Sequence, residues 1–343
     1  MKAFIGKRNF EEFFYLAAIT TAAVVVVFLY VCLYLNHTYI LDQRQVTELL
    51  AVCAGFPALF TAIAGLYLQK DDSELPRGVR LLFLGLVTGT ALCFIFGTLG
   101  YLFSIVLTYA FHGLIYSMAG ASILSAILSG LAVYFSAVFV FKINQRKFAA
   151  LIITTLLFGF LLAAAKNNDH FWWQSSLCAL GMPVNQAPIY YNFTMMLTGA
   201  LVLAFGSFLK PQIDKLSKAK LLEADGPLVL AILYGITALN IFLMGIIPYG
   251  VSDTLNDIHI FFANYAFTHI GLVIIFSFLL FKKFPKTFIF QNYLILLLTA
   301  AFYYFTVSRY VLPYAISEII VVFATIVWFT LFTRALKKLS ENA

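Results

Sequence analysis

Long apolar stretches alternate with short polar breaks along the whole chain. A stretch of about 20 apolar residues is long enough to cross the hydrocarbon core of a bilayer as an α-helix. The pattern therefore predicts an all-α polytopic membrane protein with about ten transmembrane helices and no soluble domain. The expected helices cover residues 13–35, 47–69, 81–103, 116–141, 147–165, 190–209, 228–248, 258–281, 287–307 and 312–333.

The composition agrees with this class of protein. Hydrophobic residues make up 62% of the chain and charged residues 11%, which is far outside the range of soluble globular domains. The first apolar stretch is longer than the apolar part of a secretory signal, about 7–15 residues, so we expect it to be retained as a helix. No CxxC spacing occurs, so neither a disulfide framework nor a thiolate metal site is expected. The four cysteines are Cys32, Cys53, Cys93 and Cys178.

The distribution of charge predicts the orientation of the helices. Residues 81–141 contain no Lys, Arg, Asp or Glu and could hold two long spans or three short ones. With two spans, 19 of the 22 Lys and Arg residues fall on one side, and only Arg44, Lys166 and Arg309 fall on the other. Cytoplasmic loops are rich in Lys and Arg, so we expect both termini in the cytoplasm and the chain in a cell membrane, which we interpret as a bacterial cytoplasmic membrane. The net charge of +7 is then explained by the basic loops that set the orientation of the helices in the membrane, and no nucleic-acid partner is expected.

Short similarities suggest an internal repeat. Gly55-Phe56-Pro57 resembles Gly181-Met182-Pro183, and residues 97–112 are similar to residues 245–259. These matches predict a parallel tandem repeat of four spans, with the last two spans as additions. The alternative is that unrelated multi-pass chains share glycine and loop positions by chance. The paired histidines are His37 with His170 and His112 with His259.

Three stretches in the second half carry a family resemblance. They are SSLCALGMP at 175–183, NFTMMLTGALVLAFGSFL at 192–209 and GIIPYGVSDTLNDIH at 245–259. With these motifs the second half resembles the bacterial six-span membrane proteins of domain-of-unknown-function group 998. The resemblance implies a six-helix unit with a shared outer-loop motif and no particular reaction. We therefore expect a four-span unit over residues 1–146 and a six-span unit over residues 147–343.

Polar side chains gather in the loops expected at the outer surface, above all in residues 165–183. Three or four converging His or carboxylate ligands could bind zinc, as in membrane hydrolases of the ceramidase type. No HExxH or GxSxG motif supports such chemistry, and the alternative is a set of solvated loop side chains. The candidate outer polar cluster comprises Asp169, His170, Ser175, Ser176, Asp257, His259, His37 and His112, and a metal would be held by His170, Asp257 and His259.

Three ionisable residues lie within or at the ends of expected spans: Glu318, Arg309 and His269. A carboxylate inside a membrane is unfavourable unless it is paired or lines a wet cavity. Glu318 therefore indicates either a proton or cation relay or a structural pair with Arg309, a lysine or a tyrosine hydroxyl.

Three classes of function remain open. The first is a non-enzymatic membrane protein with a transport-like or lipid-handling role, which uses an outward-facing polar vestibule and has membrane lipids as partners. The second is a metal-dependent intramembrane lipid hydrolase, and the third is an accessory or regulatory subunit of a membrane complex. We assign no catalytic residue and expect no cofactor, and the sequence indicates no oligomeric state.

Overall fold

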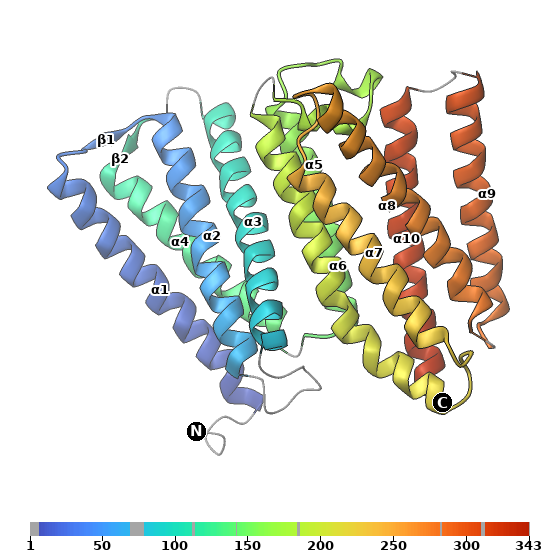
Figure 1. Ribbon diagram of the computed structural model, residues 1–343. Helices are drawn as coiled ribbons and strands as arrows, with labels where there is room; N and C mark the ends of the chain where they lie inside the picture. Colours follow the sequence, from blue (N-terminus) through green and yellow to red (C-terminus); the bar gives the residue numbers. More distant parts are fainter. Residues whose placement is uncertain are drawn as a thin grey trace. The chain divides into compact units, whose positions relative to one another are not determined.

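The computed structural model describes residues 7–68, 79–111, 114–141, 143–183, 186–281, 283–309 and 313–342. These residues contain ten helices that are each long and apolar enough to cross a membrane, which confirms the polytopic all-α class. The helices are α1 (Lys7–Leu35), α2 (Gln43–Leu68), α3 (Val79–Ala110), α4 (Met118–Val140), α5 (Gln145–Lys166), α6 (Ala187–Lys218), α7 (Gly226–Ile246), α8 (Asp253–Leu279), α9 (Lys286–Arg309) and α10 (Tyr314–Glu341) (Figure 1).

The chain divides into two compact units, Met1–Ile143 with α1 to α4 and Asn144–Ala343 with α5 to α10. The uncharged stretch at 81–141 forms two helices, α3 and α4, as the charge distribution favoured. In the first unit a short strand β1 (Ile40–Leu41) pairs antiparallel with β2 (Tyr116–Ser117).

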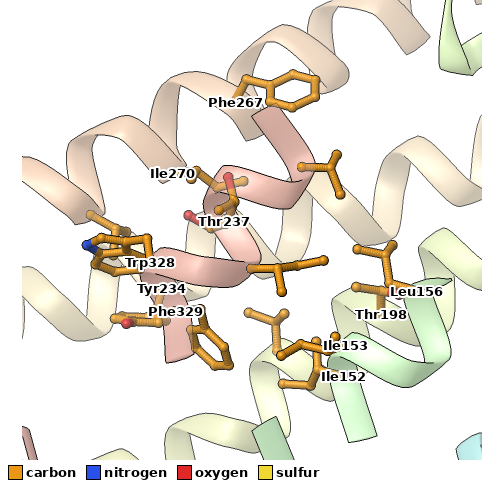
Figure 2. A pocket seen from close by; sticks show the side chains of 15 residues that line it. Ile152, Ile153, Leu156, Thr198, Tyr234, Thr237, Phe267, Ile270, Trp328 and Phe329 are labelled. Carbon is orange, nitrogen blue, oxygen red and sulfur yellow. The ribbon is translucent and has the colours of Figure 1, made fainter. Parts of the chain in front are cut away.

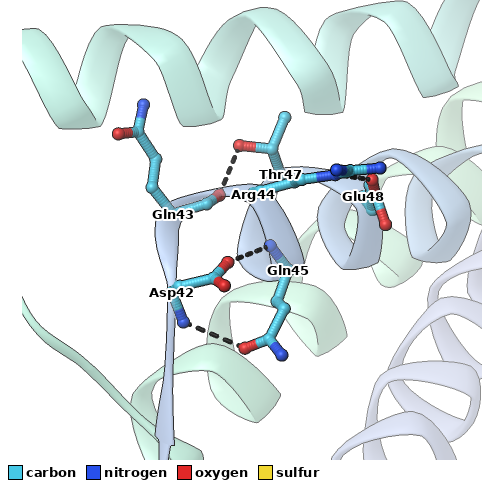
Figure 3. A network of polar contacts seen from close by, with 6 residues as sticks. All are labelled: Asp42, Gln43, Arg44, Gln45, Thr47 and Glu48. Carbon is cyan, nitrogen blue, oxygen red and sulfur yellow. Dashed lines mark hydrogen bonds and ion pairs between the residues drawn. The ribbon is translucent and has the colours of Figure 1, made fainter.

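A reciprocal cap begins α2 in the first unit (Figure 3). The Asp42 carboxylate accepts a hydrogen bond from the Gln45 amide N–H at 2.7 Å, and the Gln45 side chain accepts one from the Asp42 N–H at 3.0 Å. This arrangement satisfies two N–H groups that a helix start leaves unpaired. The neighbouring Arg44–Glu48 ion pair is exposed and therefore adds little stability.

A proline inside α2 is matched by a serine of α4. Pro57 has no N–H, so the carbonyl of Cys53 four residues earlier has no helical donor. The Ser129 hydroxyl lies 2.6 Å from that carbonyl and 2.8 Å from the Ser125 carbonyl of its own helix. A neighbouring helix thus supplies the hydrogen bond that the proline removes, as membrane interiors require.

The second unit packs α6 closely against α7. A Cβ added at Gly199 would lie 2.6 Å from the Phe242 amide nitrogen, and one added at Gly245 would lie 2.5 Å from the Asn192 carbonyl oxygen. Only glycine permits such close backbone contact between helices. Two 3₁₀ turns, η2 (Trp172–Gln174) and η3 (Leu177–Gly181), connect α5 to α6. We call this end of the second unit the η3 end.

The expected end of the sixth span at residue 209 is wrong, because α6 continues to Lys218. The added segment carries Lys210, Asp214 and Lys215, and the Lys215 ammonium donates to the Ser340 carbonyl of α10 at 2.6 Å. A hydropathy pattern marks the apolar part of a helix and cannot mark where the helix itself stops.

The tandem repeat gains no support from the fold. Pro57 lies inside α2, whereas its proposed counterpart Pro183 lies in the connection after η3. The main partner of α1 is α4, whereas α5 packs mainly on α6. The repeat therefore stays a prediction.

The Pro57–Ser129 pair predicts a non-additive effect on stability. Ser129→Ala should lower the free energy of unfolding by about 1–2 kcal/mol, because the Cys53 carbonyl loses its donor. In a Pro57→Ala background the helix restores that donor, so the same change should be nearly silent. Thermal unfolding of the four proteins in detergent measures this coupling, and equal effects of Ser129→Ala in both backgrounds would contradict it.

Candidate functional site

The loop between α5 and α6 is held together by its own polar side chains. The Asp169 carboxylate accepts from the Phe171 N–H at 2.8 Å, and the Trp173 indole donates to the His170 carbonyl at 3.1 Å. The Ser175 hydroxyl donates to the Trp172 carbonyl at 2.9 Å. These contacts are turn-forming bonds to the local backbone, so the Asp169 and Ser175 side chains of the candidate cluster build the loop itself.

His259 is a buried residue near the start of α8, and its side chain makes a structural hydrogen bond. Its Nδ1 lies 2.7 Å from the Ile247 carbonyl, and because a carbonyl can only accept, Nδ1 must carry the proton. The side chain therefore closes the connection between α7 and α8, beside the ring of Tyr249 at 5.4 Å. Asp257, two residues earlier, is exposed.

The candidate metal set is not assembled in the part of the chain that the structure describes. No three His, Cys, Asp or Glu side chains among these residues lie close enough together to hold a metal ion. His37 belongs to the first unit and is exposed, with a φ of 53°. His112 lies outside the described residues.

Glu318 makes a hydrogen bond to a segment 141 residues away in the sequence. Its Oε2 accepts a hydrogen bond of 2.6 Å from the N–H of Leu177, the first residue of η3. The Ser175 carbonyl also accepts from the Ala315 N–H at 3.0 Å, so the first two turns of α10 hold this loop at two points. The carboxylate thus caps a turn whose first N–H groups have no partner within it.

This partner differs from those expected for Glu318, since it is a backbone amide and not an Arg, Lys or Tyr side chain. The side chain of Arg309 lies outside the described ones. The His269 side chain has a structural role, because its Nδ1 lies within hydrogen-bond distance, 2.6 Å, of the Tyr265 carbonyl one helical turn away.

A cavity of about 80 Å³ adjoins Glu318 inside the second unit. Cys178 of η3, Tyr191 of α6 and Val322 of α10 contribute to its wall, and among the described residues that line it Glu318 alone has an acidic or basic side chain of the Asp, Glu, Lys or Arg type. The Tyr191 hydroxyl donates to the Cys178 sulfur at 3.8 Å. Burial, reinforced by the nearby Glu318 charge, raises the pKa of the Cys178 thiol to about 12. The thiol is therefore neutral at pH 7 and is a poor nucleophile.

A second cavity of about 140 Å³ adjoins the first (Figure 2). Leu156, Phe267, Ile270 and Val322 line both. Figure 2 shows side chains of several helices around this space, including Thr198, Tyr234 and Trp328. Trp328 lies 14 residues after the first residue of α10, which corresponds to a depth of about 21 Å in a helix of 28 residues. This cavity therefore lies midway along the helices.

The wall of this larger cavity is apolar apart from a few hydroxyl groups and the Trp328 indole N–H. The hydroxyl oxygens of Thr198 and Tyr234 are buried and make no hydrogen bond within the described part of the protein. The Trp328 indole donates to Asn292 at 2.6 Å. The sequence analysis did not single out these residues, because isolated Thr, Tyr and Trp residues are common in membrane helices.

Ten apolar helices and an interior built from their facing side chains define a multi-pass membrane protein. No protein-family model matches the chain, and neither a curated protein nor a solved structure is detectably similar to it. The resemblance to group 998 therefore stays a prediction.

The Glu318 contact predicts a specific loss of stability. Glu318→Leu should lower the free energy of unfolding by about 1–3 kcal/mol, because it leaves the Leu177 N–H without an acceptor in a buried position. Glu318→Gln keeps an acceptor oxygen and should lose less. Thermal unfolding and hydrogen exchange at the Leu177 amide measure both effects. Unchanged exchange in the Leu variant would show that the carboxylate does not hold η3.

The buried Cys178 thiol predicts a dependence of stability on alkaline pH. Because its pKa is raised in the folded protein, the folded state binds the proton more tightly than the unfolded state. This contribution is fully present below the ordinary thiol pKa of about 8.5 and is lost as pH rises from there toward 12. The range from about pH 8 to about pH 10 includes the ordinary thiol pKa of about 8.5. Over this range, the unfolding temperature of the natural protein should fall more steeply than that of Cys178→Ala.

Cys32→Ala is the matched control, since Cys32 lies in α1 of the other unit. Its pH profile should follow that of the natural protein. Parallel profiles for the natural protein and Cys178→Ala would refute the assignment to Cys178.

Proposed function

We propose that this chain is a lipid-handling membrane protein whose second unit holds a hydrocarbon chain of a membrane lipid without reacting with it. The observation that carries this proposal is the pair of adjoining cavities, about 80 and 140 Å³, which extend from Glu318 to the middle of the helices. Sites at this depth are typical of membrane proteins that bind or move a substrate.

The chemistry of the walls favours hydrocarbon as the occupant. Apolar cavities of about 150 Å³ stay free of water and bind small hydrocarbons such as benzene. An ion or a polar solute would find few groups in the larger cavity to replace its water, since the exceptions are hydroxyls such as those of Thr198 and Tyr234. A hydrocarbon chain that enters such a space exchanges one apolar environment for another, so no polar group loses its hydration.

The η3 end closes the cavities in this proposal. Leu177 and Cys178 of η3 line the smaller cavity, and the hydrogen bond from Leu177 to Glu318 holds η3 in place. Neither cavity is lined by Asp169, His170, Asp257 or His259, so the lipid role needs no polar vestibule. A metal-dependent hydrolase gains no support from the described residues.

The orientation remains part of the proposal. The excess of Lys and Arg on one side supports cytoplasmic termini in a bacterial cytoplasmic membrane, with the η3 end facing outward.

Quenching of tryptophan fluorescence tests the occupant. The protein has three tryptophans, so Trp172→Phe/Trp173→Phe leaves Trp328 in the cavity wall as the only one. Titration of this variant in detergent with a phospholipid brominated on its acyl chain should give saturable quenching. The additional change Val322→Phe should weaken binding roughly fivefold or more, because overfilling a packed interior costs about 1–3 kcal/mol.

Val327→Phe is the matched control, since Val327 lies on the same helix and is 51% exposed. It should bind like the parent protein. Quenching that does not saturate, or that both substitutions leave unchanged, would exclude a lipid chain in the cavities.

A further inference from the structure

A groove of about 380 Å³ lies between α6 and α7, toward the end of the second unit opposite η3. All the described residues that line it belong to these two helices. Leu203 and Leu228 are 56% and 64% exposed, so the groove opens on the surface of the unit. It is distinct from the two interior cavities.

Two glycines line the groove and place no side chain in it. A Cβ added at Gly206 of α6 or at Gly235 of α7 would meet no atom within 4 Å, although both residues line the groove. Nearer η3, the same two helices are in backbone contact at Gly199 and Gly245. The pair is therefore closed toward η3 and open toward its other end.

The groove and the larger cavity share part of their walls. Val202 and Tyr234 line both spaces. The Tyr234 hydroxyl is buried between them and has no hydrogen-bond partner among the described groups. Tyr234 thus separates the surface groove from the interior cavity.

The polar end of the groove carries both signs of charge. The Lys210 ammonium lies 2.6 Å from the Asp214 carboxylate, and both side chains are exposed. Lys210 lies eight residues beyond Val202 on α6, a distance of roughly 12 Å along the helix. This is close to the thickness of one leaflet of the hydrocarbon core, roughly half of 30 Å.

We propose that the α6–α7 groove is a lateral entrance for a zwitterionic phospholipid. Its phosphate pairs with Lys210, its ammonium group pairs with Asp214, and one acyl chain follows the groove past Tyr234 into the cavity. Because the two charged residues cancel, a headgroup that carries both charges replaces the ion pair without leaving either residue unpaired. An anionic headgroup would meet the Asp214 carboxylate unfavourably. This inference rests on the proposed function and adds the route and the headgroup class.

The rate of lipid loading tests the route. In the protein with Trp328 as its only tryptophan, stopped-flow mixing with brominated phosphatidylethanolamine should give a quenching phase. Gly206→Leu and Gly235→Leu, made separately, fill the groove and should each slow this phase roughly tenfold or more. Gly271→Leu is the matched control, because a Cβ at this α8 glycine also meets no atom within 4 Å and the residue lines neither groove nor cavity. It should load at the parental rate.

A comparison of binding affinities tests the proposed headgroup. The parent protein should bind brominated phosphatidylethanolamine more tightly than brominated phosphatidylglycerol, and Asp214→Ala should reverse this order by removing the negative charge.

The outcomes separate the two proposals. Parental loading rates in both folded groove variants, with quenching at equilibrium intact, overturn the entrance and leave the cavity proposal standing. An order of headgroup affinity that Asp214→Ala does not change overturns the pairing with Lys210 and Asp214. No saturable quenching in the parent protein overturns the proposed function and the entrance together.

Discussion

Every peptide group inside hydrocarbon must find its hydrogen-bond partner within the protein, because no water is present to supply one. Ten helices satisfy this requirement for most of the described chain. The structure meets it elsewhere with single side chains. Ser129 of α4 serves the carbonyl that Pro57 frees in α2, and Glu318 of α10 serves the first N–H of η3. Both contacts join segments far apart in the sequence, so the requirement also determines which helices stay together.

The interior space of the second unit follows from where large and small side chains lie. Gly199 and Gly245 allow α6 and α7 to touch, whereas Gly206 and Gly235 leave a gap between the same helices. Around the larger cavity, Trp328 stacks on Phe332 with ring centroids 5.1 Å apart. Rigid rings of this size cannot fill every space that the helices leave. The cavity and the groove are therefore results of packing, and no polar site is needed to explain them.

Much of the fold could be predicted from the sequence, because long apolar stretches have few ways to satisfy their backbones. The spans, their number and the two helices in 81–141 follow from this constraint. The length of α6 could not be predicted, since the segment after residue 209 is polar yet remains helical. Glu318 was recognisable as a carboxylate in an apolar stretch. Its partner was not, because a backbone N–H 141 residues away leaves no mark in a residue pattern.

The bond between Leu177 and Glu318 also orders the assembly of the second unit during synthesis. The η3 turn is made before α6, but the carboxylate that caps it belongs to α10, 141 residues later in the sequence. Until α10 is inserted, the Leu177 N–H can be satisfied only by water at the membrane surface. The wall of the smaller cavity is therefore complete only after α10 has been made and inserted, and a chain that stops before α10 lacks the group that seals it.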